Sequence, residues 1–323
     1  MKDYGEIPGG KNELQPLLYT FHRAYPNKLW SKYRWFRNSR LPSLLPSLNK
    51  RKRWLTVIDR LGAPGDALIT ANVIRCIKEN YPKLRINCIT PNPELIRLDP
   101  HIDSINQPES FYSFDSSYWE LIVRKEKHLN VVQYSLSRLN IPKYEYKAKY
   151  YMSAEESSFA GNEIAKINPT RPIIAICSKS KEDVKNWPEN LWKELLEKLS
   201  ISHTIIHLGD NSEPSFNNVS RFAGVASIRE SAALLSKAEF FIGPDSLLMH
   251  VANGLNIPSV IIFGGSRPLK CFGYEQNLNL DSKPKCSPCW IHKGYDACNE
   301  SLKCLKEISV NLVLSSINSL MQN

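Results

Sequence analysis

The sequence contains no long apolar run. Nowhere in its 323 residues does a stretch approach the roughly 18 consecutive apolar residues that a membrane-spanning helix needs. Residues 1–20 also lack the compact apolar core that follows a basic start in a signal peptide. These two absences predict a cytoplasmic protein whose eight cysteines stay reduced. There is also no internal repeat, which excludes repeat architectures.

Net charge is almost absent from most of the chain and concentrated at its start. Residues 1–54 hold 12 Lys and Arg against 3 Asp and Glu, a balance of +9, whereas the remainder holds 30 against 29, a balance of +1. Within residues 28–53, large aromatic side chains alternate with basic ones. This composition suits peripheral contact with an anionic membrane surface, and it also suits nucleic acid. A solvated extension, interrupted by Pro42 and Pro46, is the third interpretation. The neutral remainder disfavours nucleic-acid binding as the main role.

Apolar periodicity beyond residue 53 predicts two alternating series of strands and helices. The first begins with a strand at 54–61, followed by a helix ending near Pro82 and a strand at 85–90. Residues 120–123 suggest a further strand and 129–139 a helix. The second series has its strands at 173–177, 204–208, 240–242 and 260–263, with helices between them. Such βαβ order predicts an α/β protein with two Rossmann-like domains, at 54–151 and 152–323, behind an N-terminal extension at 1–53.

The turn after the first strand, Gly62-Ala63-Pro64-Gly65-Asp66, is a candidate ligand loop. It is not G-x-G-x-x-G, so the dinucleotide-binding fingerprint is absent. Gly62 and Gly65 allow a sharp turn and a close approach of the backbone to a ligand. We expect Asp66 to be the helix N-cap at the carboxyl edge of the sheet, where an ionised carboxylate can accept a proton. Capping alone is the alternative.

A second candidate site lies at residues 243–265, where a short strand turns into a helix. The first N–H groups of a helix lack intrahelical partners and favour an anion, so this segment suits a phosphate or diphosphate. Ser246 and His250 are four residues apart and would share one helix face. Capping by Asp245 and Ser246, with a packed His250, is the alternative. Lys185, in Lys-Asn-Trp-Pro before another helix, would face the same cleft and neutralise a phosphate, unless it is an ordinary surface lysine.

Five of the eight cysteines fall within residues 271–304. Cys286 and Cys289 form a C-x2-C pair, with Cys298 and Cys304 downstream and Cys271 as a substitute. Four such thiols predict a structural zinc or iron site. Reduced free thiols and disulfides are the alternatives, and a reducing compartment disfavours the disulfides.

Taken in order over residues 54–310, these motifs resemble glycosyltransferase family nine, the heptosyltransferase group with the GT-B fold. The matching segments are Leu61–Asp66 with the helix to Pro82, Lys185–Pro188 with Trp192, Phe222–Gly224, and Asp245-Ser246 with His250. The last departs from the family's D-[ST]-G-x-x-H signature because Leu247 replaces the glycine. Some members carry a similar cysteine cluster, which autotransporter heptosyltransferases use for iron.

The resemblance implies a role for each matching residue. Asp66 would deprotonate the acceptor hydroxyl, while Lys185, His250 and the backbone of Ser246 and Leu247 would bind the departing nucleotide diphosphate. Ala226 would lie near the nucleobase. The N-terminal domain would face the acceptor and the C-terminal domain would bind the nucleotide sugar.

The implied reaction is an inverting single displacement that requires no metal cofactor. Its donor would be ADP-heptose or a related sugar nucleotide, and its acceptor a cell-surface glycan, a lipid-linked glycan or lipopolysaccharide. Two alternatives are a protein glycosyltransferase of the autotransporter type and a catalytically silent GT-B-like binding protein. The presence of Asp66, Lys185 and His250 argues against the silent protein.

Overall fold

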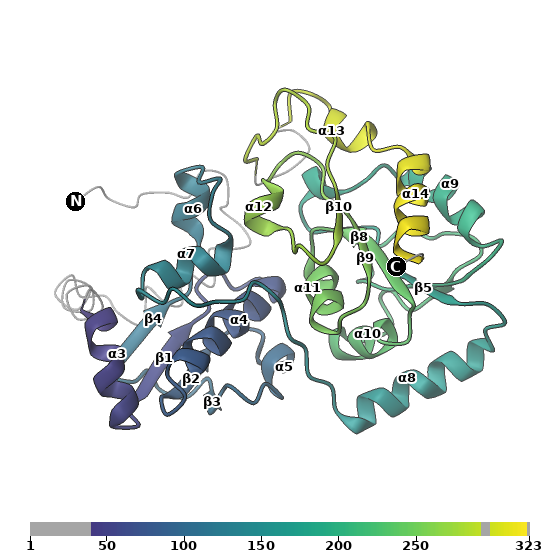
Figure 1. Ribbon diagram of the computed structural model, residues 1–323. Helices are drawn as coiled ribbons and strands as arrows, with labels where there is room; N and C mark the ends of the chain where they lie inside the picture. The colour runs from purple at the N-terminus through teal and green to yellow at the C-terminus, as the bar shows by residue number, and fades with distance from the viewer. Residues whose placement is uncertain (1–39, 292–297, 322–323) are drawn as a thin grey trace.

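The chain folds around two parallel β-sheets, each with helices packed on it (Figure 1). The computed structural model describes residues 40–291 and 298–321. In the first half, a four-stranded sheet has the order β3-β2-β1-β4. Its strands are β1 (Trp54–Ile58), β2 (Arg85–Ile89), β3 (Ser104–Ile105) and β4 (Tyr112–Asp115). Its helices are α3 (Leu41–Lys50), α4 (Pro64–Asn80), α5 (Pro93–Ile96), α6 (Trp119–Val123) and α7 (Val131–Ser137).

The second half contains a six-stranded parallel sheet of order β10-β9-β8-β5-β6-β7. The strands are β5 (Ile173–Ile176), β6 (Thr204–His207), β7 (Ser220–Arg221), β8 (Phe240–Pro244), β9 (Ser259–Ile262) and β10 (Leu278–Leu280). Helices α8 (Ala154–Ile167), α9 (Glu189–Leu199), α10 (Ile228–Leu235), α11 (Leu247–Gly254), α12 (Leu269–Phe272), α13 (Lys303–Lys306) and α14 (Val310–Met321), with the 3-10 turn η1 (Asp183–Lys185), accompany them. The predicted α/β class with two parallel sheets is confirmed.

The two strands that precede the candidate ligand loops, β1 and β8, are buried inside their sheets. β1 is buried along four of its five residues and pairs with both β2 and β4. β8 is buried throughout and pairs with both β5 and β9. Strands covered on both faces read as continuous apolar runs, which is how these two were recognised in the sequence. In a parallel sheet their carboxyl ends open on the same edge as those of their neighbours, where ligands bind.

Two local expectations for residues 41–123 were wrong. Residues 41–50 are not a solvated extension but helix α3, whose Leu41, Leu45 and Leu48 are buried in the core. Pro42 is tolerated in the first turn, where its missing N–H is not needed. The strand expected at 120–123 is helix α6, and β4 lies just before it. A short apolar run alone does not distinguish helix from strand.

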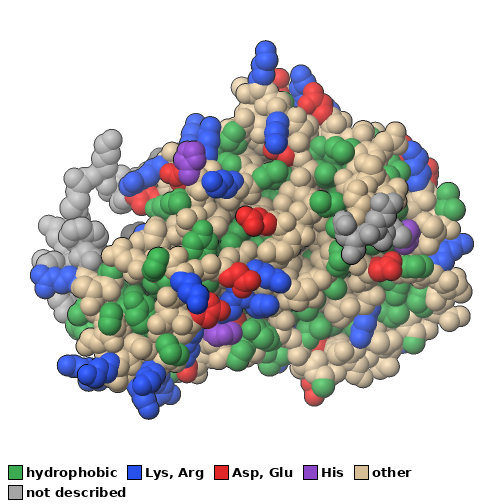
Figure 2. Space-filling model, viewed as in Figure 1, with side chains coloured by type: hydrophobic (Ala, Val, Ile, Leu, Met, Phe, Trp, Pro, Cys, Tyr) green, Lys and Arg blue, Asp and Glu red, His purple; other side chains and the backbone are tan. Residues whose placement is uncertain are grey.

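The start of the described chain is basic. Lys50, Arg51, Lys52 and Arg53 are exposed at the end of α3, and Figure 2 shows Lys and Arg side chains gathered at the lower left, where α3 ends. Residues 28–39 of the predicted membrane-contact segment lie outside the described residues. Among the described helices, none is both long enough and apolar enough to cross a membrane.

Candidate active site

The loops after β1 and β8 meet where the two domains face each other. Helices α4 and α11, which begin at these loops, pack together. Gly65 lies directly against His250: a Cβ added at Gly65 would come within 3.0 Å of His250 Cδ2 and 3.1 Å of Nε2. A side chain at position 65 would therefore make His250 shift by a few tenths of an ångström, so glycine suits this close approach of the first domain's loop to the second domain's histidine. The structure thus brings the two candidate sites of the sequence together.

Asp66 is the third residue of α4 and not its N-cap, which is Ala63. Its Oδ2 accepts the Ala63 N–H at 3.1 Å, and its Oδ1 accepts the hydroxyl of Tyr118. The Asp66 carboxylate therefore accepts one of the free N–H groups at the start of α4, although Asp66 itself belongs to the first turn of the helix. Each oxygen has one donor and keeps one lone pair for another ligand.

The environment of Asp66 makes it a stronger base than an ordinary aspartate. Burial, together with the charge of Asp59, raises the pKa of Asp66 to about 7, although the Tyr118 hydroxyl, the Ala63 N–H and Lys185 act in the opposite direction. A carboxylate with this pKa is partly ionised at neutral pH and binds a proton well. A carboxyl whose pKa is perturbed by burial and by a specific neighbouring charge marks a functional-site candidate.

Asp59 supports the same loop from the end of β1. Its buried carboxylate accepts the Gly62 N–H at 3.0 Å and the Thr90 hydroxyl at 2.8 Å. The first bond closes the turn in which Gly62 has a φ of 77°, a conformation that favours glycine. Burial raises the pKa of Asp59 to about 6 in spite of these two bonds. Asp59 was not among the predicted site residues because it fell inside the strand expected at 54–61, whereas β1 ends at Ile58.

Lys185 lies in η1 and forms an ion-pair network at the edge of the second sheet. Its Nζ is 3.0 Å from Asp245 Oδ2 and 3.4 Å from Glu182 Oε1. Burial lowers the pKa of Lys185, but these two carboxylates outweigh it and the net shift is upward. An ammonium group has three donors, so one remains for a phosphate oxygen. Asp245 itself is buried and is engaged in orienting the lysine.

Ser246 is the N-cap of α11, yet its side chain does not cap the helix. Its buried Oγ has no N–H or oxygen partner within the described part of the chain and lies beside the Cys177 thiol, which is a weak hydrogen-bonding group. A buried hydroxyl with so weak a partner remains available to a ligand oxygen. Leu247, which follows, is half-buried and begins the helix.

His250 is buried on the next turn of α11 and is neutral at physiological pH. Burial and the charge of Lys185 lower its pKa to about 4, although Asp245 opposes them. Its Nδ1 is 2.8 Å from the hydroxyl of Tyr274. Burial raises the pKa of Tyr274, so this phenol keeps its proton. When it donates to Nδ1, Nε2 carries the imidazole hydrogen and faces the Gly65 loop.

Comparison with known proteins assigns the chain to a family. The sequence pattern of glycosyltransferase family 9 (heptosyltransferase) matches residues 112–293, more than half of the chain. The chain belongs to glycosyltransferase family 9. Lipopolysaccharide heptosyltransferase 1 of Pseudomonas aeruginosa is 25% identical over 138 residues, 39% of each protein. The chain thus spans about two fifths of the length of the curated relatives it matches.

Solved structures support the fold. The family 9 glycosyltransferase of Veillonella parvula superposes with a TM-score of 0.66 at 14% identity, covering 84% of this chain and 98% of that one. Iron-containing dodecameric TibC of enterotoxigenic E. coli gives a TM-score of 0.66 at 19% identity, covering 83% and 76%. TibC has also been solved in complex with ADP-D-β-D-heptose. These likenesses confirm the GT-B expectation for this family 9 chain.

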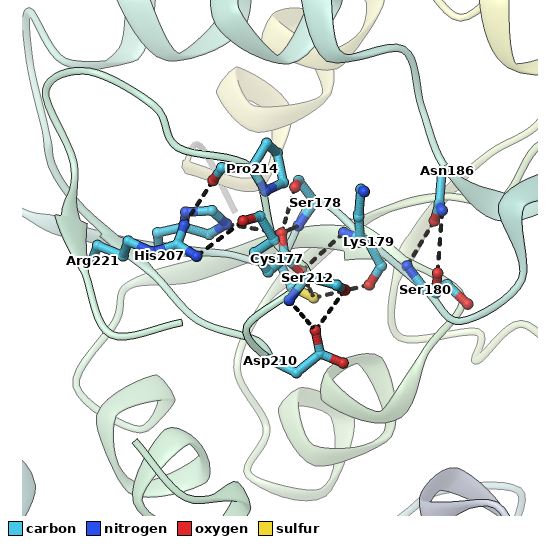
Figure 3. Close-up of polar contacts among 11 residues, drawn as sticks. Cys177, Ser178, Lys179, Ser180, Asn186, His207, Asp210, Ser212, Pro214 and Arg221 are labelled. Atoms are coloured by element: carbon cyan, nitrogen blue, oxygen red, sulfur yellow. Dashed lines mark hydrogen bonds and ion pairs between the residues drawn. The ribbon is translucent and has the colours of Figure 1, made fainter. Parts of the chain in front are cut away.

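Glu213, which was not among the residues predicted from the sequence, has a buried carboxylate that joins two loops at the carboxyl edge of the six-stranded sheet. Glu213 accepts the N–H groups of Ser178 and Lys179, both at 3.0 Å, and His207 Nε2 lies 2.9 Å away. Figure 3 shows how the loop at 177–180 and the loop at 210–214 come together around these contacts. Burial raises the pKa of Glu213, but its bonds from His207 and Ser178 outweigh burial and hold it below its usual value. Nothing in the local sequence indicated this network, since its members come from separate loops.

Ala226 lies half-buried in the loop before α10, where its N–H donates to Phe222 at 3.0 Å. Its position beside a nucleobase stays a prediction.

The four cysteines of the predicted metal site lie after β10, whereas Cys271, the substitute, is buried in α12 before that strand. Cys304 is buried, Cys289 and Cys298 are half-buried and Cys286 is exposed. Burial raises the pKa of the Cys304 thiol, and nearby Cys289 and Cys298 add to this. Across residues 40–291 and 298–321, however, no three His, Cys, Asp or Glu side chains are gathered as a metal site requires. As placed, the thiols do not form the tetrahedral set, so a structural metal stays a prediction.

Proposed function

We propose that this family 9 protein is an inverting heptosyltransferase. It transfers heptose or a related sugar from a nucleotide-diphosphate donor, ADP-heptose being the leading candidate, to a cell-surface glycan or lipopolysaccharide acceptor. The observation that carries the proposal is the contact of the Asp66 loop with His250, because it sets a base and an anion-binding helix terminus face to face.

In the proposed reaction, the acceptor hydroxyl gives its proton to a free lone pair of Asp66. The acceptor oxygen forms a bond to the anomeric carbon, while the bond from that carbon to the diphosphate breaks. The electron pair leaves with the nucleoside diphosphate, and one displacement inverts the anomeric centre. Lys185, Nε2–H of His250 and the first N–H groups of α11 would stabilise the charge on the leaving group.

The raised pKa of Asp66 also argues against a catalytically silent binding protein. Desolvating a carboxylate beside Asp59 costs stability, and a protein that only bound a ligand would have no use for it.

Asp66→Asn tests the proposal. The amide cannot accept the proton, so we expect turnover to fall by at least ~10²-fold, the usual scale for a positioned base. Donor binding, measured by calorimetry with ADP, should change little because Asp66 does not contact the diphosphate in this scheme. Parent turnover should rise with pH through about 7 as Asp66 ionises.

Asp103→Asn is the matched control. Asp103 also accepts a backbone N–H, that of Ile86 at 2.7 Å, and pairs with Lys78, but it lies beside β3 on the far side of the sheet. Turnover of Asp66→Asn equal to that of this control would show that Asp66 is only a cap.

A further inference from the structure

Tyr118, in the loop between β4 and α6, donates its hydroxyl to Asp66. The two residues are 52 positions apart, so this contact exists only in the folded domain. Together with the Ala63 N–H on the other oxygen, it fixes the carboxylate plane at two points. Because side-chain torsions of aspartate are otherwise broad, two donors on opposite oxygens determine where the remaining lone pairs lie.

The position of Tyr118 depends on the other domain. Its ring meets Phe272 of α12 edge-on, with centroids 5.8 Å apart and an interplanar angle of 74°. The backbone carbonyl of Phe272 in turn accepts the hydroxyl of Tyr146 at 2.9 Å. Two residues further on, Tyr274 contacts His250. One short segment therefore touches both the tyrosine that holds Asp66 and the tyrosine that holds His250.

We propose that Tyr118 is a positioning residue for the base: its hydroxyl aims the Asp66 carboxylate at the acceptor and keeps it from holding a proton too tightly. The proposal deepens the proposed function and rests on it, since it assigns Asp66 the acceptor proton. Tyr118 is not itself a second base, because burial and the neighbouring Asp66 raise its pKa well above the usual value.

The charges around Asp66 show why such a donor is needed. Asp59 at the end of β1 and burial both oppose its ionisation, while Lys185 of η1 favours it. His250 of α11, across Gly65, is neutral, and Asp245 pairs with Lys185. A hydrogen bond to the charged form favours that form. Tyr118 is thus the one hydroxyl among these groups, in the described part of the chain, that donates to the ionised carboxylate.

Tyr118→Phe tests the proposal because it removes one hydroxyl and keeps the ring that packs on Phe272. The pKa of Asp66 is read by carbon NMR of the full chain, with Asp66→Asn assigning the signal. We expect this pKa to rise by about one pH unit, the scale for losing a hydrogen bond to a charged group. The acid limb of the kcat profile should move up with it, while KM for the donor stays unchanged.

Tyr134→Phe is the matched control. Tyr134 of α7 also donates to a carboxylate, Glu120 Oε2 at 2.8 Å, but neither residue is among the groups that shift the pKa of Asp66. Its loss should leave the Asp66 titration unchanged. If Tyr118→Phe does not fold, as judged by thermal melting, Phe272→Leu replaces it. This variant keeps the hydroxyl but loosens the ring, and a smaller upward shift is expected.

The two proposals fail separately. An Asp66 pKa in Tyr118→Phe within about 0.3 unit of the parent would overturn the role of Tyr118, whatever happens to activity. Absence of glycosyl transfer by the parent would overturn the proposed function, and the NMR titration would still decide whether Tyr118 controls Asp66.

Discussion

At the scale of single residues, the environment of each side chain sets its chemistry: burial beside Asp59 raises the pKa of Asp66, and burial beside Lys185 lowers that of His250. Gly65, Asp66, Lys185, Asp245 and His250 were identified from short segments, and the structure brings them close together where α4 packs against α11. The partners that tune them were not predicted: Asp59, Tyr118, Glu182 and Tyr274. Each comes from outside the motif it serves, so no spacing rule reveals it. Burial and, to a smaller extent, Asp59 make Asp66 a base suited to neutral pH, burial keeps His250 neutral, and the Tyr274 hydroxyl on Nδ1 leaves the imidazole hydrogen on Nε2.

Lys185 and His250 should contribute differently to diphosphate binding. Lys185→Ala removes a cation and leaves two carboxylates facing the phosphate, so ADP affinity should fall by about 10²-fold. His250→Ala removes one neutral hydrogen bond, and its loss should be about 10-fold. The pKa of His250 is about 4, so its imidazole stays neutral at every pH well above that value. The loss of ADP affinity in His250→Ala should therefore be the same at about pH 6 and about pH 8. Calorimetry with ADP measures both.

Adenosine lacks the diphosphate, so a variant that loses only phosphate contacts should bind adenosine with the affinity of the parent. We expect this result for both Lys185→Ala and His250→Ala. Lys193→Ala, which removes an exposed lysine paired with Glu189 on α9, is the control. Equal losses for ADP and adenosine would disprove the assignment to the diphosphate.

At the scale of elements, the predictable parts are those whose burial shows in the sequence. β1, β8 and α4 were predicted because continuous or periodic apolar residues mark them. Helix α3 was missed even though Leu41, Leu45 and Leu48 have helical spacing, because Pro42 and Pro46 suggested an interrupted coil. The short α6 and β4 depend on tertiary packing, which an isolated five-residue pattern does not encode.

The cysteine-bearing segment packs on the loop that follows β9. A Cβ on Gly265 would approach Cys304 Cβ to 2.9 Å, and the N–H groups of Cys289 and Trp290 donate to Gly265 and Ser266 at 3.2 and 2.9 Å. Arg267 Nη1 donates to Ile291 at 2.9 Å, and its Nη2 lies 3.8 Å from Glu182, which pairs with Lys185. Arg267 thus connects this segment with the ion-pair network of Lys185.

We predict that Cys286, Cys289, Cys298 and Cys304 bind one structural metal when it is available. Such a site supplies on the order of 10 kcal/mol, and in the described residues between β10 and α13 no helix or strand stabilises the segment. Elemental analysis of protein purified without added metal should give close to one zinc or iron per chain. A chelator should then lower the melting temperature of the parent but not of Cys289→Ser.

Less than about a tenth of a metal per chain, with all thiols titratable in the folded state, would exclude this site. The contacts of Cys289, Trp290 and Ile291 with the loop after β9 would then hold the described part of the segment without a metal.

At the scale of the whole molecule, one arginine connects the two domains and the chain that links them. Arg229 of α10 is buried and bonds both oxygens of Glu156 on α8, one of them at 2.7 Å. It also donates to the carbonyls of Glu94 in α5 and Tyr151 in the linking segment, both at 2.7 Å. Arg97 of the first domain reaches the same Glu156 at 2.6 Å. Two cations from different domains thus share one carboxylate.

Glu156→Gln should loosen this connection and destabilise the protein by about 1–3 kcal/mol at pH 7, the range for losing charged hydrogen bonds. Bonding to Arg229 lowers the pKa of Glu156 from 4.5 to about 2. A lowered carboxyl pKa contributes stability above the unfolded-state value and loses it as the pH falls through the folded-state value. The difference in unfolding free energy between parent and variant, measured by urea unfolding, should therefore shrink as the pH falls from about 4.5 toward 2.

Glu163→Gln is the control. It breaks the exposed pair with Lys166 on the same helix and should lower the free energy of unfolding much less. Equal losses for the two variants, or a Glu156 difference independent of pH, would show that the shared carboxylate does not join the domains.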